Sequence, residues 1–231
     1  MIGAGIVLLG VGLADLIRLH APARGRAAFF VVAALTVLIV ASGADAGVWA
    51  FVAAGTAAMW ILATPGSAGG RAGLWPLVAV GLVTLGAVAF QGVREDQGPL
   101  GELWPVTSPL GAVSLDVGVF VLGSLVFLTE SGNVVVRAAL RGGEVAPDAP
   151  TALKGGRLIG PLERVLVFAL TVTGAFTLLA AVLAAKGIVR FPEISRDTDL
   201  GTRAEYFLIG SLVSWVTALG AAFLLWWGTA A

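Results

Sequence analysis

The chain has 231 residues, of which 58% are hydrophobic and 12% are charged, and its mean hydropathy is +0.97. Soluble domains carry about 25% charged residues, so this composition excludes an ordinary soluble domain and indicates transmembrane helices. The net charge is zero, which gives no support to a nucleic-acid partner. There is no cysteine and only one histidine. We therefore expect neither a metal nor a cofactor.

The apolar segments predict an all-α polytopic membrane protein, a transmembrane helical bundle of about seven spans. The predicted spans are about Ile2–Leu19, Ala27–Ser42, Ala46–Thr64, Leu74–Gln91, Gly111–Thr129, Leu162–Ala185 and Tyr206–Trp227. No basic residue precedes Arg18, so we interpret the first span as an uncleaved helix and not as a signal peptide. Residues 130–153 begin with a segment that can prolong the fifth span as a helix.

The distribution of Lys and Arg among the loops predicts the orientation. The loops after the first, third and fifth spans are basic, which places the N-terminus outside and the C-terminus inside. The loop after the sixth span conflicts with this pattern, because its four basic residues would then lie outside. We divide the chain into an N-terminal membrane bundle of five spans (1–129) and a C-terminal part (130–231). The second part is predicted to be a cytoplasmic connector followed by a two-helix module.

Asp116 is the most deeply placed acid in the predicted spans, about five residues into the fifth span, or ~7 Å below the interface. It is either a carboxylate that binds a cation or proton, or an acid favoured at a helix N-terminus and paired with Lys186 or Arg190. Those two cations lie one helical turn apart and repel each other. We expect Lys186 to pair with Glu205, which also forms a capping box with Thr202. Candidates for binding an ion or solute are therefore Asp116, Lys186, Arg190 and Glu205.

Arg157 and Arg164 lie seven residues apart, on one face if the sixth helix begins early. They are candidates for holding lipid head groups, although basic side chains at a membrane edge often only extend toward water. Glu163 follows a proline and is expected in the first helical turn, where acids are favoured. Asp15 and Arg18, one turn apart in the first span, are interpreted like Glu163 as structural charges. The middle of the bilayer is expected to hold only hydroxyl groups, such as those of Thr and Ser.

Three sequence boxes follow one another in the last part of the chain: GRLIG-LER (156–164), AAK-R-F (184–191) and EY-LIG-S (205–211). Their order resembles two late helices of a family of bacterial multi-spanning membrane proteins of unknown function. The resemblance covers about residues 130–215 and does not extend to the first four spans. It implies a multi-pass protein of the bacterial plasma (inner) membrane, and it implies no activity.

No Ser-His-Asp set can form with a single histidine, and no phosphate-binding Gly-Lys-Ser/Thr loop occurs. The sequence thus favours a non-enzymatic scaffold or accessory subunit of a membrane assembly. Its expected partners are the lipid bilayer and either a second copy of the chain or another membrane protein. The alternative is a transporter or channel for an ion or small solute. A third reading is a membrane enzyme that acts on lipid.

Overall fold

The computed structural model describes residues 1–64, 74–90, 97–104, 113–141, 156–195 and 202–230, and within them every regular element is a helix. The predicted all-α class is confirmed. Four helical segments are long and apolar enough to cross a membrane, and they are Ile2–His20, Arg26–Gly43, Leu115–Leu140 and Phe207–Ala230. Three shorter apolar helices accompany them, and they are Gly47–Ala63, Trp75–Ala89 and Phe176–Val189.

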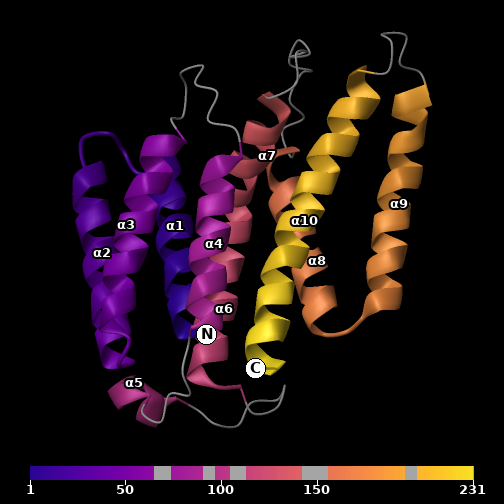
Figure 1. Cartoon of the computed structure of the whole chain (residues 1–231). Coiled ribbons are helices and arrows are strands. Elements are labelled where there is room, and N and C mark those ends of the chain that lie inside the picture. The colour runs from indigo at the N-terminus through magenta and orange to yellow at the C-terminus, as the bar shows by residue number, and fades with distance from the viewer. Residues whose placement is uncertain (65–73, 91–96, 105–112, 142–155, 196–201, 231) are drawn as a thin grey trace.

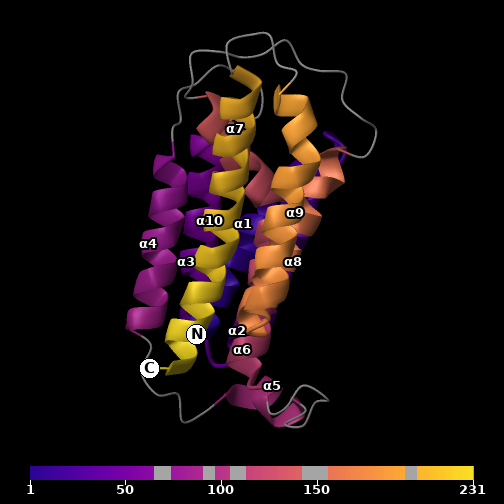
Figure 2. The ribbon, with the colours of Figure 1, turned by 90° about the vertical axis from the view of Figure 1, so that its right-hand side faces the viewer.

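The helices run alternately up and down along one axis (Figures 1 and 2). The first four are α1 (Ile2–His20), α2 (Arg26–Gly43), α3 (Gly47–Ala63) and α4 (Trp75–Ala89). After the short α5 (Gly98–Leu103), one rod consists of α6 (Leu115–Val126), the π-helical turn η1 (Phe127–Ser131) and α7 (Gly132–Arg141). The last three are α8 (Gly156–Val172), α9 (Phe176–Ser195) and α10 (Thr202–Ala230). Helix α7 confirms that the fifth span continues as a helix.

The sixth predicted span is wrong, because residues 162–185 do not form one continuous helix. A tight turn at Thr173–Ala175 separates α8 from α9, and Gly174 occupies it with a φ of 71°. Glycine adopts this left-handed conformation without steric cost, so an apolar run that reads as one span can fold back on itself. The turn adds a pass to the bundle and brings both chain ends to the same end of the molecule (Figure 1).

Helix α1 occupies the centre of the N-terminal half, where it packs against α2, α3, α4, α6 and η1. Its contact with α6 is backbone to backbone, because glycines face each other across it. A Cβ atom on Gly123 would overlap the carbonyl oxygen of Gly5, and one on Gly12 would lie 2.8 Å from the backbone nitrogen of Phe127. Small residues permit this close approach, which is typical of helix packing in membranes.

The outer surface of the bundle is apolar. In α2 only Val37 and Ala41 are buried, although the helix consists almost entirely of apolar residues. Large exposed side chains on other helices include Phe51 at 71% and Leu62 at 82% exposure. Apolar faces of this extent are rare on soluble monomers, and they are compatible with an integral membrane protein.

We predict that Gly123→Ala lowers the free energy of unfolding by about 1–3 kcal/mol, because the added methyl group forces α1 and α6 apart. Gly81→Ala in α4 is the matched control, since a Cβ there meets nothing within 4 Å. The control is expected to be neutral or up to about 1 kcal/mol more stable, because alanine is the better helix former. Thermal or SDS unfolding of the purified variants measures both effects. Equal stability of the two variants would contradict the close α1–α6 contact.

Candidate functional site

The rod formed by α6 and α7 contains a π-helical turn at its middle, η1. In a π turn the backbone hydrogen bonds span five residues instead of four, which inserts an extra residue and leaves carbonyl groups without their usual helical donors. Such turns are frequent at functional sites. In a bundle interior those carbonyls need another donor, because unpaired polar groups are costly away from water.

Arg164, on α8, supplies that donor and is itself only 1% exposed. Its Nε donates to the carbonyl of Leu128 at 2.6 Å, and Nη2 donates to the carbonyl of Thr129 at 2.9 Å. Nη2 also donates to Oδ1 of Asn133 at 2.7 Å, and Nη1 reaches Oγ of Ser214 on α10 at 3.4 Å. One guanidinium group therefore links α8 to the α6–α7 rod and to α10. It is not a free cation for a lipid phosphate.

Gly132 explains how the guanidinium comes so close to the π turn. A Cβ atom at this position would overlap Arg164 Nε and would lie 2.8 Å from Cζ. Only glycine leaves this space open at the start of α7.

A second buried charge, Asp15 on α1, is 3% exposed and lies on the other side of η1. Its Oδ2 accepts hydrogen bonds from Nε1 of Trp60 at 2.8 Å and from Oγ of Ser131 at 2.7 Å. Nη2 of Arg18 lies 3.0 Å from Oδ1, and Nη1 of the same arginine donates to the Thr64 carbonyl at 2.6 Å. The carboxylate is thus neutralised inside the chain, and it holds α3 and η1 against α1. That Asp15 and Arg18 serve only as structural charges stays a prediction.

Glu163 precedes Arg164 and forms the third charged group. Both of its carboxylate oxygens accept from Nζ of Lys186 on α9 at 2.5 Å, and Oε1 also accepts from Nε1 of Trp215 at 2.7 Å. The Lys186 ammonium lies 5.4 Å from the ring centre of Phe207 and 5.3 Å from that of Trp215. Such cation–π contacts add attraction to the ion pair. Together these contacts fasten α9 to α8 and α10.

These three groups form one network through the bundle interior, because η1 contacts both Asp15 and Arg164, and Glu163 is the neighbour of Arg164 in the chain. At 1.5 Å per residue, Asp15 lies ~20 Å from the start of α1, and Glu163 lies ~15 Å from the turn that ends α8. The network therefore lies at about mid-depth of the bundle. The expectation that only hydroxyl groups lie in the middle of the bilayer stays a prediction, because the structure does not place the bilayer.

The turn at Gly174 makes it possible for Glu163 and Lys186 to pair. A continuous helix over 162–185 would put Glu163 at one membrane face and Lys186 at the other. Because α8 and α9 run antiparallel, the two residues meet instead at the same depth.

Three of the four candidates for ion or solute binding, Asp116, Lys186 and Glu205, are not brought together. Asp116 lies in the first turn of α6, near the chain termini, with Oδ2 3.6 Å from the amino group of Met1. Lys186 pairs with Glu163 and not with Glu205, which is exposed in the first turn of α10. Arg190 lies on α9, and its side chain is outside the described residues, so its predicted role remains a prediction.

The other predicted positions also differ from expectation. Glu163 is not in the first turn of its helix, because α8 begins at Gly156 and contains Pro161 in its interior. The Arg157 side chain lies outside the described residues, so its role in holding lipid head groups remains a prediction, whereas Arg164 is buried. The proposed connector at 142–155 is likewise outside them.

Sequence reasoning missed the neutral partners of the charges, above all Trp60, Ser131, Asn133 and Trp215. A tryptophan indole N–H or an amide inside an apolar segment needs a hydrogen-bond partner. That requirement predicts buried hydrogen-bond acceptors, but the sequence alone does not show which acceptor each indole or amide group contacts. No group of three or more potential metal-binding side chains occurs among the described residues.

Comparison with protein-family models, curated proteins and solved structures gave no match to this chain.

We predict that Arg164→Lys destabilises the protein by about 3 kcal/mol, although the charge is retained. A lysine ammonium cannot reach the acceptors on η1, α7 and α10 in the planar arrangement of a guanidinium group. Arg24→Lys, at an exposed position between α1 and α2, serves as the control and should leave stability unchanged. Unfolding of the two variants in detergent gives the comparison. If Arg164→Lys were as stable as the control, the bonds to the π turn would not be important for stability.

Proposed function

We propose that the protein is an integral membrane protein whose bundle crosses the bilayer in eight passes, with both termini outside. The eight passes are α1, α2, α3, α4, the α6–α7 rod, α8, α9 and α10. Their apolar outer faces and the partnered charges inside support embedding in lipid, where charges are tolerated when they face the bundle interior. The shortest passes are accommodated by local thinning of the bilayer.

The distribution of charge along the axis supports this orientation. In the described part of the chain, the basic residues outside the buried network belong to segments near the end opposite the termini, and they are Arg24, Arg26, Arg137, Arg141, Arg157, Arg190 and Arg203. The charged residues at the end that carries the termini are acidic within the same described ranges: Asp45, Glu102 and Asp116. Basic segments remain on the cytoplasmic side of bacterial membranes. In a seven-span topology the basic residues after the sixth span would lie outside. With α8 and α9 as separate passes, these residues lie on the same side as the other basic segments.

Single-cysteine labelling tests the orientation, because the natural chain contains no cysteine. We expect Thr173→Cys, at the exposed α8–α9 turn, to react with a membrane-impermeant maleimide added to intact cells. Arg24→Cys should react only after the membrane is permeabilised. A continuous span over 162–185 would place residue 173 in the bilayer interior and leave it unlabelled on both sides, and this result would refute the hairpin topology.

For its role, we propose a non-enzymatic scaffold or accessory subunit of a membrane assembly, located in a bacterial plasma membrane. The observation that carries this proposal is that the buried charges already have partners within the chain. Arg164 bonds to η1, Asp15 to Trp60 and Ser131, and Glu163 to Lys186. Charges held in this way fasten helices together. The arrangement gives less support to a transport mouth built from Asp116 and Lys186, because these residues lie at different depths.

Purification in a mild detergent tests this role. The scaffold proposal predicts a stable homo-oligomer by light scattering, or a membrane protein that co-purifies at a fixed ratio, because exposed apolar helix faces can pack against other helices. Mixing of two differently tagged copies after solubilisation controls for detergent-induced association. A monomer that purifies alone and conducts ions after reconstitution would contradict the proposal and favour the transport alternative.

A further inference from the structure

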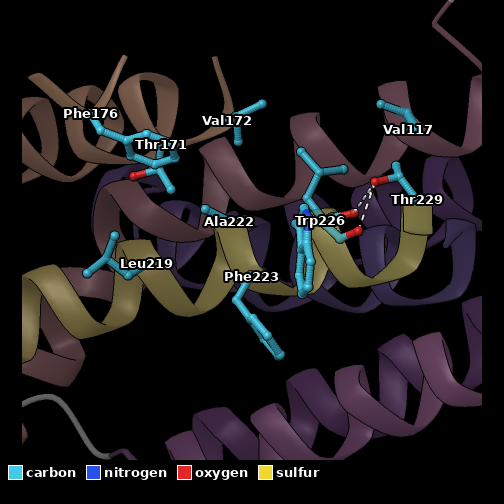
Figure 3. A pocket seen from close by; sticks show the side chains of 10 residues that line it. Val117, Thr171, Val172, Phe176, Leu219, Ala222, Phe223, Trp226 and Thr229 are labelled. Carbon is cyan, nitrogen blue, oxygen red and sulfur yellow. Dashed lines mark hydrogen bonds between the residues drawn. The ribbon is translucent and has the colours of Figure 1, made fainter. Parts of the chain in front are cut away.

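An apolar groove of about 530 Å³ runs along the last turns of α10 at the end of the bundle that carries the termini (Figure 3). We call it the α10 groove. Its walls come from α10, the α8–α9 turn and the first turn of α6, and they include Val117, Val172, Phe176, Leu219, Phe223 and Trp226. Ala222 forms part of its floor and is buried.

The groove opens on the outer surface of the protein. Phe176 and Trp226 are each 64% exposed, and Phe223 is 52% exposed. In the membrane topology proposed above, this surface faces lipid in the outer leaflet, so the groove is open to hydrocarbon.

The two threonine hydroxyl groups in the walls are already used within the chain. Thr171 donates its hydroxyl hydrogen to the carbonyl of Val167 at 2.7 Å. The Thr229 hydroxyl lies 3.0 Å from the carbonyl of Leu225 and 2.9 Å from that of Trp226 (Figure 3). The two threonines therefore donate no hydrogen bond to an occupant, which meets a lining that consists mainly of apolar side chains.

The dimensions of the groove favour one kind of occupant. From Leu219 to Thr229 it follows α10 for ten residues, or ~15 Å, which is half of a hydrocarbon core of ~30 Å. A helix ~10 Å in diameter fills roughly 400 Å³ per turn, so the groove holds little more than one turn of a partner helix. A flexible hydrocarbon chain can follow its full length within a single leaflet.

We infer that the α10 groove binds one acyl chain of an outer-leaflet membrane lipid and retains it when the surrounding lipid is removed. This inference rests on the proposed membrane embedding. Because only the chain enters the groove, phospholipids with different head groups are expected to bind alike.

Photocrosslinking at Phe223 tests the inference. The benzophenone analogue of phenylalanine replaces Phe223 in the full-length protein, which is reconstituted into vesicles of phosphatidylglycerol and phosphatidylethanolamine. The same replacement at Phe51, 71% exposed on α3 and near the same end of the bundle, is the matched control. Illumination in vesicles should give lipid adducts at both positions. After delipidation in detergent, adducts should persist at position 223, with both phospholipids represented, and disappear at position 51.

The results distinguish failure of the groove inference from failure of the proposed membrane embedding. Loss of adducts at both positions after delipidation would overturn the groove inference alone, and absence of adducts at both positions in vesicles would contradict membrane embedding itself. An adduct between two copies of the chain, or with another protein, at position 223 would show that a helix covers the groove and would also overturn the inference.

A second variant tests the volume of the groove. Val172→Trp fills its wall, and native mass spectrometry should show loss of the retained lipid. Val216→Trp adds the same side chain at a position that is 60% exposed and does not line the groove, so it should retain the lipid. Equal retention by the two folded variants would exclude this groove as the binding site.

Discussion

The hydrogen bonds from Arg164 to the π-helical turn are the interaction on which the arrangement of the bundle depends. A π turn leaves backbone carbonyls that the helix does not satisfy, and an apolar interior offers no water to replace the missing donors. A guanidinium group is suited to this task because it presents several donors in one rigid plane. Arg164 uses this geometry to bond to Leu128 and Thr129 on one helix and to reach α10. The extra residue of the turn also changes which face the following residues present, and Ser131 thereby meets Asp15 on α1.

This protein has an apolar core like that of a soluble domain, but its surface is apolar as well and a few charges are buried inside it. Phe51 and Leu62 are largely exposed, whereas Asp15 and Arg164 are almost completely buried. Transfer of an isolated charge into hydrocarbon costs several kcal/mol, so each buried charge requires partners close by. Trp60 and Trp215 have a double role in this respect, because their rings fill apolar space while their indole N–H groups bond to carboxylates. The same contacts that neutralise the charges also fix which helices are neighbours.

Much of the fold was predictable from the sequence, and the parts that were not have identifiable causes. Apolar segments of sufficient length predicted the helical class and the approximate position of most helices. The sixth span was misjudged because Thr173, Gly174 and Ala175 are common in membrane helices, and only the backbone conformation of Gly174 reveals the turn. That one error also separated Glu163 from Lys186 and led to the pairing of Lys186 with Glu205. The π turn and the partners of Arg164 depend on contacts between residues more than thirty positions apart, which periodicity along one helix does not encode.

In the proposed membrane topology, the antiparallel pairing of α8 and α9 has a consequence for how this part of the chain enters the bilayer. A charged residue near the middle of a single helix disfavours its insertion by about 3 kcal/mol. Glu163 and Lys186 would each carry this penalty if their helices were inserted one at a time. Because the turn at Gly174 is short, the two segments can leave the translocation machinery as one hairpin in which the acid and the base already neutralise each other. The ion pair thereby lowers the free-energy cost of inserting two segments, each of which would insert poorly by itself.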